Sequence, residues 1–168
     1  MGPQRQRTAM IRPTSMIPSV GITARVFSDL RALATCAFGK GKELALSQYQ
    51  QGVNVIFHAS GSTGLGVFEA ARQTNKLAIG VDADQYNEAP GYVLTSMVKG
   101  VDNAVYDAIK RVKENRFAGG IYQYGLAEDG VGYVYDKNNE KLIPADVRAR
   151  VEALKKEIIA GRIVVPST

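Results

Sequence analysis

The hydrophobic residues in the middle of the chain fall into two short continuous runs, separated by a stretch with helical spacing. The two runs are Val53–Phe57 and Leu77–Val81, and their length and polar borders are typical of buried strands. Between them, the apolar residues of Leu65–Gln73 recur at the spacing of an amphipathic helix. This pattern predicts two strands joined by a crossover helix, which must lie parallel with a right-handed connection.

A loop of small residues joins the first run to the helix, and it contains Ser60, Gly61, Ser62, Thr63, Gly64 and Gly66. Gly61 and Gly64 allow backbone N–H groups to approach a ligand closely, and Ser62 or Thr63 is expected to cap the helix. Asp82 follows the second run. Because open parallel sheets bind ligands at the carboxyl ends of their strands, we expect a small-molecule site here. A purely structural tight turn explains the loop almost as well.

His58 lies at the end of the first strand, next to the loop. A neutral imidazole there can bond a ligand, but a histidine satisfied at the sheet edge also fits, and the sequence leaves both roles open. Four tyrosines occur at alternate positions: Tyr122, Tyr124, Tyr133 and Tyr135. They can either stack on a base or form one face of a hairpin. The alternation favours the hairpin.

Further elements are expected on both sides of this unit. Lys42–Gln50 is expected to form a helix that packs on the sheet through Leu44, Ala45 and Gln48, and Tyr92–Val98 is expected to form a strand. A second long helix is expected from Asp102 onward. Its apolar stripe consists of Val101, Ala104, Val105, Ala108, Ile109 and Val112.

The last third of the chain predicts a hairpin, a helix and a short strand. Ile121–Leu126 and Val131–Tyr135 flank a turn at residues 127–130, which is typical of a hairpin. Pro144 suits the first turn of a helix that Gly161 ends, and Ile163–Val165 is expected to form a terminal strand. The whole pattern predicts an α/β fold with a mainly parallel sheet flanked by helices.

The formal charge of +5 arises mainly from residues 1–38, which hold five Arg and one Asp, whereas the remainder holds 16 basic and 15 acidic residues. A nearly neutral body argues against a nucleic-acid-binding face. The single cysteine excludes an internal disulfide, and the single histidine excludes a histidine-rich metal site. No apolar run approaches the length of a membrane span.

Residues 1–38 differ in pattern from the domain that we expect over residues 39–168. Apolar clustering is weak and confined to Val20–Ala37, so we expect a poorly ordered arm without a strand. Asp29 and Arg31 interrupt any signal-peptide core. Leu33–Cys36 has the outline of a lipobox, but the Thr before the Cys fits it poorly, and lipidation is not expected.

Four segments follow one another with short gaps: FHASGSTGLGVFEAA, AIGVDADQ, APGYVLTSMVK and GLAEDGVGYVYD. Together they resemble the basic membrane lipoprotein family, the PnrA-like nucleoside-binding solute receptors of ABC importers, over roughly residues 39–166. The resemblance implies one lobe of a two-lobed type I periplasmic-binding-protein fold, mainly its C-terminal part. It also implies a purine nucleoside ligand, an ABC transporter permease as partner, a cell-surface or periplasmic location, and neither a cofactor nor a catalytic residue. We expect a truncated protein with weak or no ligand binding.

In the resembled family, the carboxylate of the Gly-Val-Asp segment and the lysine of the Thr-Ser-x-Val-Lys segment bind ribose hydroxyls, and the matching residues are Asp82 and Lys99. A carboxylate can accept both protons of a vicinal diol while an ammonium donates to its oxygens. Spacing alone leaves Asp84 as a competitor. The resemblance also implies that the helix after Asp102 crosses to the other lobe. We therefore expect its Val105 and Ile109 face to be covered by residues 20–37 or by a second copy of the chain.

Two other functions fit parts of the sequence. The glycine loop, the following acidic residue and the pair Tyr106 and Lys110 fit an NAD(P)-dependent oxidoreductase of the short-chain type. Against it, the glycines are spaced G-x-x-G-x-G, and Tyr106 follows the loop too soon. A transcription regulator built on the same sensor fold is the third class, although no helix-turn-helix precedes the body.

Overall fold

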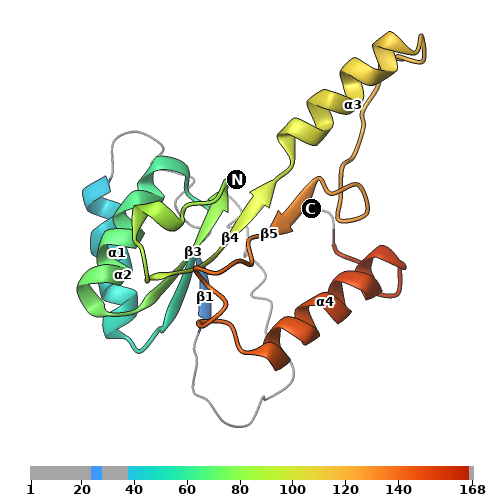
Figure 1. Ribbon diagram of the computed structural model, residues 1–168. Coiled ribbons are helices and arrows are strands. Elements are labelled where there is room, and N and C mark those ends of the chain that lie inside the picture. Colours follow the sequence, from blue (N-terminus) through green and yellow to red (C-terminus); the bar gives the residue numbers. More distant parts are fainter. Residues whose placement is uncertain (1–23, 28–37, 167–168) are drawn as a thin grey trace, which may run out of the picture.

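The computed structural model describes residues 24–27 and 38–166 of the chain. Its centre is a five-stranded sheet with the strand order β1-β2-β3-β4-β5 (Figure 1). The strands are β1 (Ala24–Phe27), β2 (Val55–His58), β3 (Leu77–Asp82), β4 (Val93–Lys99) and β5 (Val131–Tyr133). The helices are α1 (Phe38–Gln50), α2 (Gly64–Thr74), α3 (Val101–Lys113) and α4 (Ala145–Ile159), with single 3-10 turns η2 (Gly61–Thr63) and η3 (Tyr86–Glu88).

The β2-α2-β3 unit has the arrangement that the hydrophobic pattern predicts. β2 and β3 are parallel neighbours, with Val55 opposite Leu77 and Phe57 opposite Ile79. Helix α2 ends at Thr74 and is capped by Asn75, whose left-handed backbone (φ 54°) lets its N–H bond back to carbonyls of the last turn. The predicted crossover is therefore confirmed.

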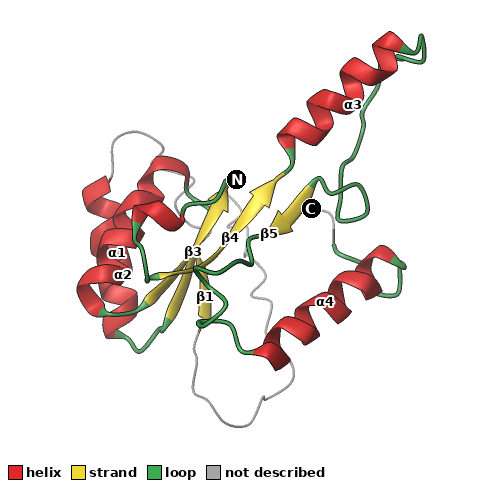
Figure 2. Ribbon diagram, viewed as in Figure 1, coloured by secondary structure: helices red, strands yellow, loops and turns green. Residues whose placement is uncertain are grey.

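Helices α1 and α2 pack side by side on one face of the sheet, as Figure 2 shows. Their backbones come close at Gly66, where a Cβ would overlap the carbonyl oxygen of Phe38 and the amide of Lys42. Beneath the helices lies the hydrophobic core, formed chiefly by Ala45, Tyr49, Val53, Ile56, Val67, Phe68, Ala70, Ala71, Ala78 and Val93. The hydroxyl of Tyr49 donates to the carbonyl of Leu77 at 2.8 Å, and burial raises the pKa of Tyr49. Burial of these side chains holds the site-bearing strands in place.

The opposite face of the sheet is covered only by α4 in the described part of the chain (Figure 1). β4 lies parallel to β3, and β5 lies antiparallel to β4, with Met97 opposite Tyr133. The sheet is thus mainly parallel with helices on both sides, which confirms the predicted fold class.

Several expected elements differ in the structure. Residues 121–126 form no strand, and β5 pairs with β4 instead, so the predicted hairpin is wrong. All three residues of β5 pair with β4, whereas Tyr122 and Tyr124 of the preceding segment contact α3. Ile163–Val165 form no strand either.

The N-terminal side also differs from the expectation. Helix α1 begins at Phe38 and buries Gly41, Ala45 and Tyr49, so Leu44, which was expected in the interface, is 38% exposed. Strand β1 falls inside the arm that was expected to lack strands, and it pairs in parallel with β2. The expected disorder of residues 1–23 and 28–37 and the lipobox-like Leu33–Cys36 lie outside the described residues. The domain boundary at residue 39 stays a prediction.

Candidate ligand-binding site

Asp82 and Lys99 end two neighbouring parallel strands and meet at the same edge of the sheet. The Nζ atom of Lys99 lies 2.6 Å from Oδ1 of Asp82, and the two side chains are 53% and 56% exposed. Such an exposed ion pair contributes roughly 0–1 kcal/mol to stability, because water screens it and two side chains lose freedom. Both groups therefore remain accessible to a solute at little cost to the fold.

The turn after β3 is held by two residues that the sequence pattern did not single out. The side-chain oxygen of Gln85 accepts from the N–H of Val81 at 2.8 Å, and the N–H of Gln85 donates to the hydroxyl of the fully buried Ser96 at 3.0 Å. These bonds fix the chain on both sides of Asp82, whose backbone has a positive φ of 72°. Both residues lie in segments that carry the family resemblance, but the bond between them joins two separate segments.

Asp84 serves a different purpose from Asp82. Its Oδ1 atom accepts from the N–H of Tyr86 at 3.0 Å, which is a local turn bond. Asp82 instead faces an ammonium group from another strand. The geometry thus separates two carboxylates that the spacing alone could not separate.

The glycine loop presents an exposed tip and a buried base. Gly61 and Ser62 are exposed, and Gly61 has a positive φ of 55°. Thr63 is 7% exposed and Gly64 is buried. Thr63 precedes α2 without a side-chain hydrogen bond to the helix, so the expected hydroxyl cap at this position is wrong. The N–H of Gly64 instead bonds back to carbonyls of the preceding 3-10 turn, so the helical structure continues from the loop into α2.

His58 lies beneath the loop, fully buried, and its ring meets Phe68 edge-on at a centroid distance of 4.8 Å. Neither ring nitrogen has a hydrogen-bond partner among the described residues. Burial lowers the pKa of His58 to about 4, while the polar side chain of Gln85 and the charge of Asp82 act in the opposite direction. The imidazole is therefore neutral near pH 7.

The seven candidate residues are thus brought to one end of the sheet, but in two layers. Asp82, Lys99, Gly61 and Ser62 are exposed, whereas His58, Thr63 and Gly64 lie below them. The exposed layer combines an acceptor, a donor and a helix N-terminus, which suits a polar ligand with several hydroxyl groups.

The tyrosines considered for stacking lie elsewhere. Tyr122 lies under the guanidinium of Arg111, and Tyr124 donates to Asp107 at 2.7 Å, so both contact α3. Tyr133 donates to Glu152 of α4 at 2.6 Å. These tyrosines form neither a stacking platform at the glycine loop nor one face of a hairpin.

Within residues 24–27 and 38–166, no group of three or more His, Cys, Asp or Glu side chains is arranged to hold a metal ion. No helix in this part of the chain is long and apolar enough to cross a membrane.

The fold is an α/β domain with candidate ligand-binding groups at the carboxyl ends of its parallel strands. A family described as "ABC transporter substrate-binding protein PnrA-like" matches residues 35–168, and the chain belongs to this family. This confirms the resemblance that the four sequence segments indicate.

Curated relatives agree with this assignment. The chain is 42% identical over 144 residues to "CD4+ T-cell-stimulating antigen" of Listeria monocytogenes, covering 76% of the chain and 40% of that protein. It is 36% identical over 144 residues to "Basic membrane protein A" of Borreliella afzelii, covering 83% of the chain and 41% of that protein. An uncharacterized lipoprotein of Pyrococcus abyssi is 43% identical over 99 residues, 55% of the chain and 24% of that protein. The chain spans about 40% of the length of the first two relatives.

Solved structures show the same fold. An ABC transporter solute-binding protein from Aeropyrum pernix has a TM-score of 0.67 and 32% identity, covering 79% of the chain and 46% of that protein. A transcriptional activator of the comK gene from Bacillus halodurans has a TM-score of 0.65 at 24% identity, covering 73% of the chain and 42% of that protein. The second likeness shows the shared fold alone.

Proposed function

We propose that this domain binds the ribose of a purine nucleoside at the carboxyl ends of β3 and β4, as part of the substrate-binding component of an ABC importer. The ion pair of Asp82 and Lys99 carries the proposal, because it presents an acceptor and a donor 2.6 Å apart at an open sheet edge. A vicinal diol can donate to the second carboxylate oxygen and accept from the remaining ammonium protons, so it can bind alongside the ion pair.

The loop after β2 provides the second part of the proposed site. Gly61 and Ser62 present backbone and hydroxyl groups at the N-terminal end of α2, where the helix dipole favours oxygen acceptors. Thr63, Gly64 and His58 lie below and set the position of this tip. A direct bond from His58 to a ligand requires the loop to move, since the imidazole is fully buried.

Binding by this chain is expected to be weak. The site is an exposed edge, where hydrogen bonds to a ligand compete with water and contribute little net free energy. A receptor that closes a second lobe over the ligand gains the contacts and the water exclusion that an open edge lacks. A dissociation constant of roughly 0.1–1 mM corresponds to about −5 to −4 kcal/mol, which a few exposed polar contacts can supply.

The proposed partners and location follow from the family. The relatives include proteins described as membrane proteins and lipoproteins, which supports a place at the cell surface or in the periplasm and a permease as partner. We also propose that the exposed Val105 and Ile109 face of α3 is an interaction surface.

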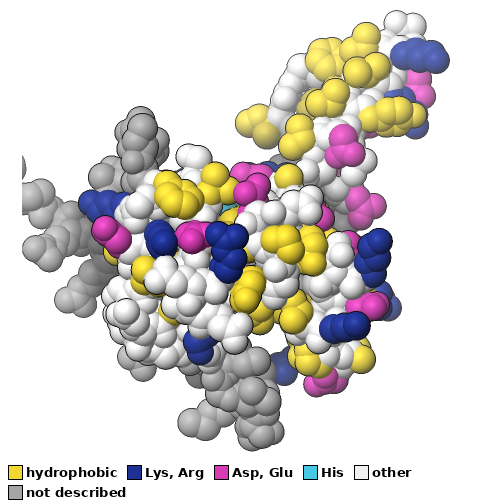
Figure 3. Space-filling model, turned by 60° about the vertical axis from the view of Figure 1, so that its left-hand side comes forward, with side chains coloured by type: hydrophobic (Ala, Val, Ile, Leu, Met, Phe, Trp, Pro, Cys, Tyr) yellow, Lys and Arg dark blue, Asp and Glu magenta, His cyan; other side chains and the backbone are white. Residues whose placement is uncertain are grey.

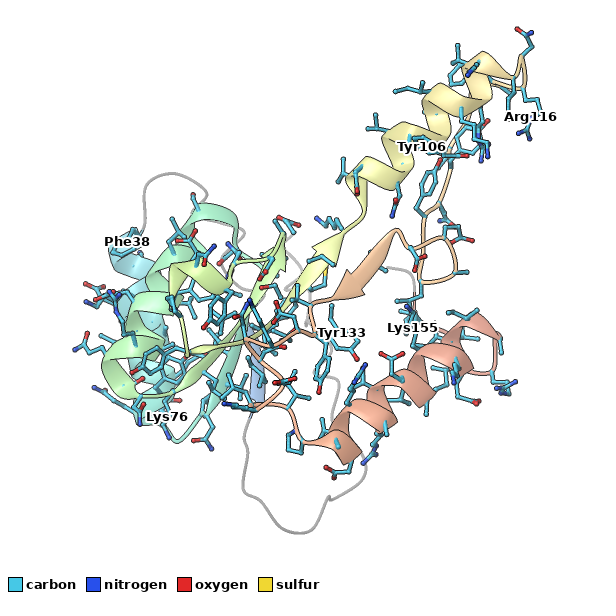
Figure 4. The ribbon with its side chains drawn as sticks, in the orientation of Figure 1. Phe38, Lys76, Tyr106, Arg116, Tyr133 and Lys155 are labelled. Carbon is cyan, nitrogen blue, oxygen red and sulfur yellow. The ribbon has the colours of Figure 1, made fainter. Side chains whose placement is uncertain are left out.

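The oxidoreductase alternative has less support. Tyr106 is 70% exposed on α3, which leads away from the sheet and from the glycine loop (Figure 4). The Tyr106 side chain is therefore not positioned to act on a cofactor bound at the glycine loop.

Calorimetric titration of the chain with inosine, adenosine and guanosine tests the proposal, with 2′-deoxyinosine and NADH as controls. We expect saturable, weak binding of the ribonucleosides and weaker binding of the deoxy analogue, which lacks one hydroxyl of the diol. Equal affinity for inosine and its 2′-deoxy form would contradict a ribose-centred site.

A further inference from the structure

Helix α3 stands clear of the body of the molecule with its apolar side uncovered (Figure 1). None of its residues is buried, and Val105, Ile109 and Val112 are 53%, 63% and 58% exposed. Figure 3 shows hydrophobic side chains gathered along this projection. A stripe of this kind on a helix normally packs against another element.

The polar side of α3 already has partners within the chain. Asn103 donates to the carbonyl of Asp129 at 3.1 Å, and Asp107 accepts from both Arg111 and Tyr124 at 2.7 Å. At about 100° per residue, these positions lie on the side of the helix opposite Val105 and Val112. The segment that returns from α3 therefore fixes its direction and leaves the apolar stripe free.

A groove of about 1020 Å³ lies between the sheet and α4, on the face opposite α1 and α2. The sheet lines it with Val55, Phe57, Ile79, Thr95 and Met97, and α4 lines it with Val151, Leu154 and Ile158 among others. We call this surface the sheet groove. Parallel strands are normally covered by helices on both faces, so the sheet groove is the size and kind of surface that takes an additional helix.

Two polar contacts connect α4 to the side of the sheet where β5 lies. The hydroxyl of Tyr133 on β5 donates to Glu152 of α4, and Nζ of Lys155 lies 3.9 Å from Oδ1 of Asp129. Tyr133 and Lys155 are labelled in Figure 4. Leu154 is still 44% exposed although it lines the sheet groove. These contacts attach α4 along one side, and the groove lies between its apolar residues and the sheet.

The chain's own α3 cannot fill the sheet groove. Gly100, Asp102 and Asn103 form part of the groove's rim, and α3 leads away from that rim (Figure 1). Met1–Ser19 shows no helical period of apolar residues, so that part of the sequence is a poor match for the groove. Residues 20–37 are the other expected cover, and a monomeric wild-type chain would favour them. A second copy, however, carries an apolar helix of 13 residues, about 20 Å long, that needs such a surface.

We propose that two copies of this chain form a reciprocal dimer in which the apolar stripe of each α3 occupies the sheet groove of the other copy. α3 begins at the rim of the groove and leads away from its own copy. A two-fold axis at the rim therefore places the α3 of one copy across the groove of the other. The same two surfaces are then buried twice, as in a closed isologous interface. Lys99 also lines the sheet groove, so the proposed pairing surface borders the proposed ribose site.

The test starts from the mass of the 168-residue chain in solution, measured by light scattering after size exclusion at about 50 μM. We expect a dimer. Ile109→Asp on α3 and Leu154→Asp in the sheet groove should each give a monomer with an unchanged circular dichroism spectrum. Lys110→Asp is the matched control, since it changes the charge of α3 away from the stripe and should leave the dimer intact.

Mixing the variants identifies the surfaces that meet. A mixture of the Ile109→Asp and Leu154→Asp chains retains one intact α3 and one intact groove, so it should form a heterodimer although neither chain pairs with itself. In a Cys36→Ser background, chains with Ile109→Cys should form disulfides with chains carrying Leu154→Cys, distinguished by a tag on one of them.

A monomeric wild-type chain would overturn the proposal. Disulfides between two Ile109→Cys chains in preference to the mixed pair would also overturn it, because they show α3 against α3. Survival of the dimer in Leu154→Asp, with the fold intact, would show that the sheet groove is not the partner surface.

Discussion

Gly64 lies directly against the imidazole of His58, and a Cβ on Gly64 would overlap the ring at Nδ1. The glycine loop can therefore follow this path over the end of β2 only because residue 64 has no side chain. Ring and loop form one packed unit beneath the exposed tip of the proposed site.

Gly64→Ala should destabilise the fold, because either the buried imidazole or the first turn of α2 must move. We expect a loss of about 1–3 kcal/mol in the free energy of unfolding, measured by urea denaturation. Gly119→Ala is the matched control, since a Cβ there meets nothing within 4 Å, and it should change stability by no more than about 0.5 kcal/mol. Equal effects of the two substitutions would show that the His58 contact does not constrain the loop.

The stability of the chain should fall as the pH is lowered from about 6.5 towards 4. Burial lowers the pKa of His58 to about 4, so the unfolded chain takes up a proton in this window before the folded chain does. Each pH unit between these values costs about 1.4 kcal/mol, a total on the order of 3 kcal/mol. His58 is the only histidine, so His58→Leu should flatten the profile between pH 6.5 and 5, where few carboxylates titrate. A variant with an unchanged profile would contradict this origin.

Loss of the Asp82 carboxylate should weaken ribonucleoside binding more than loss of the Asp84 carboxylate. Asp82→Ala removes charge-assisted bonds of about 1.5–3 kcal/mol each, which corresponds to a tenfold or greater drop in affinity. Asp82→Asn is a cleaner variant, because asparagine tolerates the positive φ of 72° better than alanine does. Asp84→Ala removes only the turn bond to the N–H of Tyr86. If both alanine variants bind inosine equally well, the assignment of the ribose contact is wrong.

Tyr106→Phe should leave every ligand affinity unchanged, because its side chain lies on α3 and is 70% exposed. Fluorescence titration should show no saturable NADH binding by the wild-type chain. Saturable NADH binding that Gly64→Ala abolishes and Gly119→Ala retains would instead favour the oxidoreductase alternative.

The strand-loop-helix-strand unit was predictable because its signals are local. Continuous apolar runs, a glycine loop and helical spacing follow one another between Val53 and Asp82, and each survives in the fold. The family resemblance pointed to Asp82 and Lys99, and the rule for parallel sheets placed both at the same end of the sheet. Their pairing was predictable from these two arguments together.

Other features depend on contacts between distant segments and left little trace in the sequence. Val131 and Tyr133 alternate as in a hairpin, but the strand that accepts them is β4, more than thirty residues earlier. Ser96 and Gln85 hold the turn around Asp82 through a bond between separate elements. β1 has only four residues, too few for a periodic pattern to show.

The brevity of β5 has a consequence for how copies of the chain meet. A sheet edge offers unpaired backbone groups to any passing strand, and long flat edges of this kind lead to fibrous aggregation. β5 closes the β4 side of the sheet with three residues, one of them the glycine Gly132, so it provides a poor template for strand addition. Self-association through side chains on α3 and the sheet groove ends at two copies, whereas growth along the sheet would have no natural end.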